Sequence, residues 1–288
     1  YLYLKNARDK GHHAVELAKR GCAKSYGLAA IMSHNLIIGE SEESKRRTIT
    51  VLTAYQKEYL KDDKDGTLSK FVPILSFLSK NTPFPRLMLK QSSNEMTWQM
   101  GYKDEYGRNQ GSLNQVIGVS DKDDSDKLRG KRGFFLFEEF GNFPSLLDLY
   151  DVTRKSVEDG DYTFALMYLI GTANNKEANF QSAKTLLYAT ESYNIESLKN
   201  VYDKKGQGRD TFGFFFPSYI NRAGCYNKDG ISDVVKALLQ VLMNRYKAKY
   251  GADPTSVLRV IAEDPITPAE AIIKVKDAYF PVAALNER

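Results

Sequence analysis

The chain has 288 residues, of which 42% are hydrophobic and 27% are charged. These proportions are typical of a folded globular protein with one large domain or two small ones, and they exclude a disordered tail, a collagen-like fibre and a coiled coil. The net charge of +5 permits contact with phosphate backbones, but it is too small to indicate nucleic acid by itself. No apolar run approaches the ~18 residues of a membrane-spanning helix, so we expect none.

Cysteine and histidine give no sign of a metal site. Cys22 and Cys225 lie far apart, and the three histidines have no partners at ligand spacing. We therefore expect reduced cysteines, as in an intracellular protein, and no structural zinc. The chain does not begin with Met and shows no signal peptide, which favours an excised fragment.

The first sixty residues alternate between predicted strands and helices. In order, we expect a helix over 1–10, a strand over 13–18, a loop over 19–25, a helix over 26–32, a strand over 35–39 and a charged helix from 41 to about 60. This order is typical of a mostly parallel sheet covered by helices on both faces.

Further elements follow from apolar patterning. We expect helices over 68–80, 145–159 and 231–250, and strands over 86–90, 96–102, 116–120, 134–137, 164–170 and 211–216. In the helix over 231–250, apolar residues recur at helical spacing from Ile231 to Tyr246, and we expect this stripe to face the core.

The loop over 19–25 is similar to a Walker A phosphate loop, or P-loop. Lys24 and Ser25 stand where that motif has the lysine that contacts phosphates and the hydroxyl that holds magnesium. Ala18 and Ala23 replace its two glycines, while Gly21 lies between them. The alternative is an ordinary solvated loop lysine.

Polar residues end two of the predicted buried strands. Glu138 and Glu139 follow the strand over 134–137, and Thr172 follows the strand over 164–170. In an open α/β sheet, ligands bind at the carboxyl ends of the strands. A Walker B pair needs one carboxylate for the magnesium-bound water and another for the attacking water. An acidic first turn of the next helix is the alternative, but the shared order of the three elements favours a nucleotide site.

With these motifs in place, the chain resembles the ATPase domain of the large terminase subunit, the DNA-packaging motor of tailed bacteriophages. The resemblance covers residues 17–271 and rests on several segments, namely 18–26, 128–144, 170–173, 215–217, 229–230 and 263–271. It implies a RecA/ASCE-like P-loop NTPase fold, α/β with a mostly parallel sheet flanked by helices. The ATPase core would span residues 1–216 and a small lid-like C-terminal subdomain residues 217–288.

The resemblance also implies a function. The chain would hydrolyse ATP with Mg²⁺ and translocate double-stranded DNA into a procapsid, gripping the phosphate backbone without reading sequence. Its partners would be a portal and a small terminase subunit, and no membrane. It would form a homo-oligomeric ring when assembled, be a monomer as an isolated domain, and act in the cytoplasm of the infected bacterial host.

Roles for single residues follow from the same hypothesis. Lys24 would contact the β and γ phosphates, and Ser25 would ligate Mg²⁺, which Glu138 would hold through water. Glu139 would be the general base, and Thr172 would sense the γ phosphate. The expected nucleotide-binding residues are Lys19, Arg20, Gly21, Cys22, Ala23, Lys24, Ser25 and Tyr26. Further basic candidates are Lys19 or Arg20 for the phosphates and Arg129, Lys131 and Arg132 for DNA or a neighbouring subunit.

Two departures from the family pattern affect the expected affinity for ATP. Ala23 restricts the loop because only glycine takes a positive φ freely, and Glu138 reaches farther than aspartate. Large terminases usually continue into a nuclease domain, and the sequence after Ala271 is too short for one, so we expect no DNA cleavage. The alternatives are another P-loop DNA helicase or remodelling ATPase, and a non-hydrolysing docking module with a degenerate P-loop.

Overall fold

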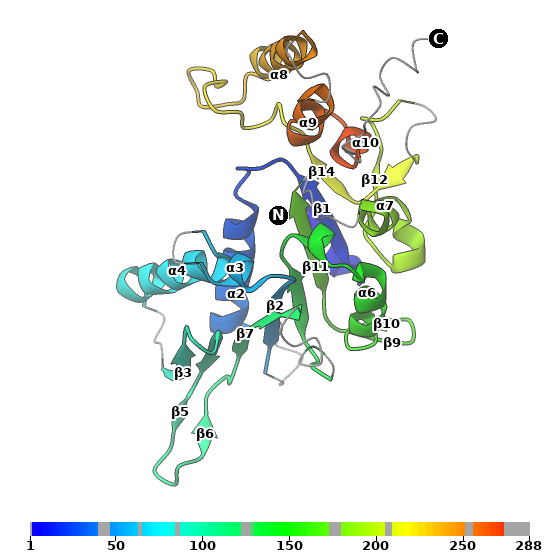
Figure 1. The fold of residues 1–288 in the computed structure, drawn as a ribbon. Coiled ribbons are helices and arrows are strands. Elements are labelled where there is room, and N and C mark those ends of the chain that lie inside the picture. The colour runs from blue at the N-terminus through cyan, green and yellow to red at the C-terminus, as the bar shows by residue number, and fades with distance from the viewer. Residues whose placement is uncertain are drawn as a thin grey trace. The chain divides into compact units, whose positions relative to one another are not determined.

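The computed structural model describes residues 2–39, 47–62, 65–83, 87–121, 128, 130–172, 180–204, 209–250 and 256–273 (Figure 1). The chain divides into two compact units. The first consists of Tyr1–Ala14 and Ala23–Ile170, and the second of Val15–Cys22 and Gly171–Arg288. The expected ATPase core over 1–216 and lid-like subdomain over 217–288 stay a prediction.

The first unit is built on a mostly parallel sheet, which confirms the predicted α/β class. Its strands follow one another across the sheet in the order β11-β8-β2-β7-β4-β3. Their bounds are β2 Ile49–Ala54, β3 Met88–Ser92, β4 Thr97–Met100, β7 Gln115–Ser120, β8 Phe134–Phe137 and β11 Met167–Thr172. The first four strands in that order are mutually parallel, and β4 and β3 add an antiparallel edge.

Strand β8 lies at the centre of this sheet, between β11 and β2. Phe135, Leu136 and Phe137 are fully buried, as expected for a parallel strand covered on both faces, whose sequence is a continuous apolar run. The register pairs Phe137 with Thr53 of β2 and with Leu169 of β11. The residues that follow β8 therefore emerge at the carboxyl edge of the sheet.

Helices of the first unit pack beside these strands. They are α1 Leu2–Lys10, α2 Lys24–Ile37, α3 Lys57–Leu60, α4 Thr67–Asn81 and α6 Leu146–Arg154, with a 3-10 turn, η2, at Phe140–Asn142. Helix α2 packs against α4 and against β2 and β7. Two hairpins complete the unit, β5 Tyr102–Lys103 with β6 Asn109–Gln110, and β9 Glu158–Asp159 with β10 Tyr162–Thr163.

The second unit contains a parallel strand pair and several helices. Strand β1, Ala14–Ala18, pairs with β14, Phe214–Phe216. The other elements are α7 Phe180–Tyr188, η3 Thr190–Tyr193, β12 Leu198–Lys199, β13 Thr211–Phe212, α8 Val234–Lys249, α9 Ser256–Glu263 and α10 Pro268–Ala271. Among the described residues of either unit, no helix is long and apolar enough to cross a membrane.

Two elements predicted near the N-terminus are wrong. Residues 35–39 do not form a strand, because α2 continues to Ile37. Asn35 is buried in this last part of α2, and its side chain donates a 3.1 Å hydrogen bond to the hydroxyl of Thr50 on β2. The helix expected from 41 to about 60 is replaced by β2 over Ile49–Ala54, whose β-branched residues favour a strand. Residues 41–46 of that prediction lie outside the described part of the chain.

The predicted core-facing stripe of the helix over 231–250 is also wrong. Helix α8 forms, but Ala237 and Val241 are its buried residues. Most large apolar residues of the expected stripe are exposed, namely Ile231, Val234, Val235, Leu239, Leu242, Met243 and Tyr246. Two sides of this helix are apolar, and periodicity alone does not identify the side that packs.

Candidate active site

The loop between β1 and α2 has the backbone of a phosphate loop. Gly21 has a φ of +74° and Ala23 a φ of +64° with ψ +24°, so two residues of this short loop are left-handed. Such a conformation costs an alanine about 1–2 kcal/mol but costs glycine little. The position that the motif normally gives to glycine thus keeps the glycine conformation in this chain.

Lys24 and Ser25 are the first two residues of α2. The first amide groups of a helix have no partner within the helix, and they carry a partial positive charge. No side chain caps the start of α2, because Ala23 has no polar side chain. The start of α2 is thus suited to bind an anion such as phosphate.

Glu138 follows the last residue of β8 and adds one more backbone hydrogen bond to the pairing of β8 with β2. Its amide donates to the carbonyl of Thr53 on β2 over 2.8 Å. Its Oε1 accepts a 2.8 Å hydrogen bond from the hydroxyl of Ser25. The side chain is buried, and its Oε2 makes no hydrogen bond of standard geometry to a described residue.

Burial also changes the acidity of Glu138. The pKa of this carboxyl is raised from 4.5 to about 7, chiefly by loss of hydration on burial and to a smaller extent by the charge of Glu139. The hydrogen bond from Ser25, the charge of Lys24 and the hydroxyl of Thr67 act in the opposite direction. Thr67, the first residue of α4, was not found from sequence, because no motif marks a hydroxyl that only the fold brings to this place.

Glu139 has a different environment from Glu138. It is only partly buried and has a φ of +47°, and its carbonyl accepts from the amide of Asn142 in the turn η2 over 2.9 Å. A non-glycine residue in the left-handed region is strained and is often found at functional sites. The two adjacent glutamates thus differ in burial, because Glu138 is buried and Glu139 is partly exposed.

The residues at this edge fit a magnesium ion. Mg²⁺ prefers hard oxygen ligands and is usually bound by one or two carboxylates together with substrate phosphates. Ser25 and Glu138 supply a hydroxyl and a carboxylate in direct contact, and Oε2 of Glu138 makes no hydrogen bond of standard geometry to a described residue. No group of three or more His, Cys, Asp or Glu in the described residues forms a separate metal site.

The remaining loop residues and Thr172 belong to the second unit. Lys19 is buried, and its Nζ donates to the carbonyls of Ser218 and Asn221 over 3.3 and 3.1 Å. Burial lowers the pKa of Lys19. The Cys22 thiol donates to the Lys19 carbonyl over 3.1 Å. Arg20 is exposed, and Thr172, the last residue of β11, is half-buried.

The other basic and aromatic candidates lie on the surface of the first unit. Tyr26 is exposed in the first turn of α2, with the Nζ of Lys70 5.7 Å from its ring centre. Arg132 is exposed and lies over the ring of Phe164, and Lys131 is half-buried. Arg129 lies outside the described residues.

Comparison with known proteins identifies the fold. No family model matches the sequence, and no curated protein matches it. Among solved structures, the large terminase ATPase domain of Thermus phage P74-26 is 13% identical to this chain, with a TM-score of 0.56. The alignment covers 93% of this chain and 92% of that domain. A mutant form of that domain is 12% identical, with a TM-score of 0.57 and 93% coverage of both chains. The chain has the fold of a phage large terminase ATPase domain.

The likeness to a terminase ATPase domain confirms the predicted α/β fold with its mostly parallel sheet. A third structure, the HK97 bacteriophage large terminase, is 11% identical and has a TM-score of 0.42, with 75% of this chain covering 38% of that one. That score is too low to carry an argument. At these identities the likeness establishes the fold alone.

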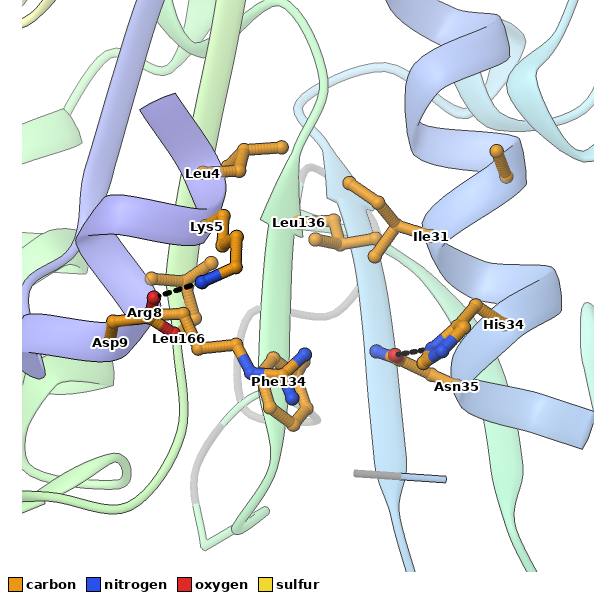
Figure 2. A pocket seen from close by; sticks show the side chains of 11 residues that line it. Leu4, Lys5, Arg8, Asp9, Ile31, His34, Asn35, Phe134, Leu136 and Leu166 are labelled. Atoms are coloured by element: carbon orange, nitrogen blue, oxygen red, sulfur yellow. Dashed lines mark hydrogen bonds and ion pairs between the residues drawn. The ribbon is translucent and has the colours of Figure 1, made fainter. Parts of the chain in front are cut away.

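A separate cavity of about 390 Å³ lies between α1, α2 and β8 in the first unit of this terminase ATPase fold. Figure 2 shows Leu4, Ile31 and Leu136 around it, with the Lys5–Asp9 ion pair on one side. Phe134 in its lining is the first residue of β8, whereas Glu138 follows the last. The cavity is thus distinct from the carboxylate site.

Proposed function

We propose that the chain is the ATP-hydrolysing motor domain of a viral DNA-packaging machine and translocates double-stranded DNA into a procapsid. The observation that carries this proposal is the 2.8 Å hydrogen bond from Ser25 to Glu138. It joins the start of the helix after a phosphate-sized loop to the acidic end of the central strand. The terminase ATPase fold supports the proposal independently of these two residues.

Nucleotide binding is assigned to the loop and the start of α2. Lys24 would neutralise the β and γ phosphates, and Ser25 with Glu138 would hold Mg²⁺, the latter through water. Bound Mg²⁺ would neutralise phosphate charge and polarise the γ phosphate. The proposed nucleotide-binding residues of the Walker A loop are Lys19, Arg20, Gly21, Cys22, Ala23, Lys24, Ser25 and Tyr26.

Hydrolysis is assigned to Glu139, which would act as the general base. Its carboxylate would take a proton from a water molecule while the water oxygen bonds to the γ phosphorus. The bond between that phosphorus and the β–γ bridging oxygen breaks, which leaves ADP and inorganic phosphate. Partial exposure of Glu139 gives water access to its carboxylate. Thr172 would sense whether the γ phosphate is present.

The proposed partners follow from the same function. Double-stranded DNA would be held through its phosphates without sequence readout, with Arg129, Lys131 and Arg132 as candidate contacts. A homo-oligomeric ring, a portal and a small terminase subunit would complete the machine in the cytoplasm of an infected bacterial host. Residues 1–216 would form the motor core and residues 217–288 its lid.

A non-hydrolysing docking module is a second candidate, because one observation favours it. Ala23 occupies a left-handed position where a glycine is unstrained, and loss of loop function would remove the selection for glycine there. The two candidates differ in turnover.

Steady-state release of phosphate from ATP, with and without double-stranded DNA, tests the motor proposal. We expect Mg²⁺-dependent turnover that DNA changes. The matched controls are Lys24→Ala, which removes the proposed phosphate contact, and Lys103→Ala on the exposed strand β5. Absence of turnover in the assembled protein would support the docking module instead. Equal turnover in both variants would show that Lys24 is not the phosphate contact and would contradict the proposed site.

A further inference from the structure

Helix α8 exposes a continuous row of large apolar side chains. The row, called here the α8 stripe, consists of Val235, Leu239, Leu242, Met243, Tyr246 and Tyr250. Between 46% and 70% of the surface of each of these residues is exposed. Isolated apolar residues on a surface are ordinary, but a contiguous row of six marks an interaction site.

The α8 stripe is not needed for packing within the second unit. The opposite side of α8 carries the buried residues Ala237 and Val241, and the helix packs against α9. Arg245 joins α8 to α10 through a two-pronged ion pair with Glu270 and also donates to the Asp264 carbonyl over 2.9 Å. The helix is thus held on one side, and the stripe remains available on the other.

Spacing within the stripe favours a protein surface as its occupant. Val235, Leu239, Leu242 and Tyr246 follow one another at intervals of four, three and four residues, which is the pattern of a helix that inserts side chains into a complementary surface. At the end of the row the ring centroids of Tyr246 and Tyr250 lie 4.6 Å apart, with the ring planes tilted by 51°. Aromatic residues of this kind are enriched in interface centres.

The charge of α8 limits the choice of partner. The helix contains four basic residues and no acidic one, and Arg245 is already paired with Glu270. The exposed lysines Lys236, Lys247 and Lys249 are therefore the charges beside the stripe. Two copies of α8 placed against each other would bring like charges together, which is unfavourable. The occupant needs acidic groups around an apolar centre.

The first unit of this same chain carries such a surface. Helix α6 exposes Asp148 and Asp151, and the β9–β10 hairpin exposes Asp159 and Asp161. Lys155, directly after α6, is also exposed, so the four carboxylates outnumber the exposed lysine. The side chains of Arg154 and Glu158 connect the end of α6 to β9, and Figure 1 shows α6 beside this hairpin. The apolar side chains exposed on these elements are Val152 and Tyr162. We call these six exposed residues of α6 and the hairpin the acidic patch.

We propose that the α8 stripe of one copy of the chain docks on the acidic patch of a second copy. The lysines beside the stripe would face the aspartates of the patch, while the apolar residues of the two surfaces would meet at the centre. Because the contact joins two different surfaces, each copy keeps one of each for the next neighbour. Such head-to-tail contacts produce a ring if they close and a filament if they do not.

This contact deepens the proposed motor assembly and rests on it for the interpretation as a ring. Its test reads association alone, in the absence of ATP and DNA. Failure of the contact would leave the ATPase proposal standing, and failure of turnover would leave the contact standing.

The experiment uses analytical ultracentrifugation of the full chain and two double variants. The stripe variant, Leu239→Ser with Tyr246→Ser, keeps the acidic patch, and the patch variant, Asp148→Lys with Asp151→Lys, keeps the stripe. We expect the mass of the unmodified chain to rise with concentration. Each variant alone should associate at least 10-fold more weakly, and an equimolar mixture should form a one-to-one dimer and no larger species. Circular dichroism melts verify that both variants fold.

Other outcomes would overturn the proposal. A patch variant that associates like the unmodified chain would mean that the stripe pairs with itself. A mixture that stays monomeric, or an unmodified chain that stays monomeric, would exclude the contact, as would stripe-dependent binding to anionic vesicles by a monomer. The matched control Lys103→Glu changes an exposed charge on β5, away from both surfaces in the sequence, and should leave the association unchanged.

Discussion

The hydroxyl of Ser25 donates a 2.8 Å hydrogen bond to Oε1 of Glu138, which lies 113 residues further along the chain. The bond connects the start of α2 to the carboxyl end of β8, and Glu138 is buried at this junction. In the same carboxylate, Oε2 makes no hydrogen bond of standard geometry to a described residue. Ser25 thus holds one carboxylate oxygen, and the other is the candidate ligand for Mg²⁺.

Stability should depend on pH through Glu138. Its pKa is about 7 in the folded chain against an ordinary value of 4.5, so the folded state binds more protons than the unfolded state between these values. Stability without Mg²⁺ should therefore fall as pH rises from about 4.5 to about 7, and stay low above that range. Urea unfolding at several pH values in a chelating buffer measures this slope.

The variant Glu138→Gln keeps the acceptor for Ser25 but carries no charge. At pH 8 without Mg²⁺ it should be more stable than the unmodified chain by about 1–3 kcal/mol, because no charge is buried. Mg²⁺ should stabilise the unmodified chain more as pH rises from 6 to 8, since the ion binds the ionised carboxylate, and it should not stabilise the variant. A variant with the same pH slope as the unmodified chain would contradict the assignment.

Substitutions at the two left-handed residues of the phosphate loop should change the stability of the chain in opposite directions. Ala23→Gly relieves the strain of a positive φ and should stabilise the chain by up to about 1 kcal/mol. Gly21→Ala introduces the same strain and should destabilise it by about 1–2 kcal/mol, although no atom within 4 Å obstructs the new Cβ. Thermal unfolding of both variants measures the difference. Equal melting temperatures would show that the loop relaxes.

A buried histidine in the first unit gives a second pH prediction. Nδ1 of His13 accepts from the Met167 amide over 3.2 Å, so the proton of the neutral ring is on Nε2, 2.9 Å from Oε1 of Glu158. Burial lowers the pKa of His13 below 6.5, and stability should be lost as pH falls through 6.5. The variant His13→Phe should lose about 1–3 kcal/mol at pH 7.5, because it leaves the Met167 amide unpaired.

The control for this prediction is His12→Phe, at the neighbouring position, which is only half-buried. It should change the free energy of unfolding by less than about 1 kcal/mol. Urea unfolding of the Glu138→Gln chain between pH 5 and 7 isolates the histidine effect, because the opposite slope of Glu138 is then absent. No loss of stability below pH 6.5 in that chain would contradict the role of His13.

The fold was predictable where one physical signal dominated. The run Phe134–Phe137 indicated a central parallel strand because continuous apolar sequence fits a strand covered on both faces. Sequence failed where two structures share a signal. Leu36 to Ile38 is a short apolar run that suits the end of a buried helix as well as a strand. In α8 two sides are apolar, and only tertiary packing decided that Val241 is buried and Leu239 exposed.

The residues of the candidate site were likewise predictable where the sequence carries a single clear signal. Lys24, Ser25, Glu138 and Glu139 were found because each stands at a fixed offset from the end of a strand or the start of a helix. Thr67 was missed, since its proximity to Glu138 depends on how α4 packs in the first unit and no offset in the sequence encodes it.

The most direct test of the proposed active site compares ATP turnover with ATP binding for Glu139→Gln and Lys24→Ala in the same assembled protein with double-stranded DNA. Glu139→Gln should retain Mg²⁺–ATP binding and lose about 10²–10⁴-fold in turnover, as expected for removal of a general base. Lys24→Ala should lose binding as well, and Lys103→Ala should match the unmodified chain in both. If Glu139→Gln turns over ATP at the unmodified rate, Glu139 is not the base and the proposed site is wrong.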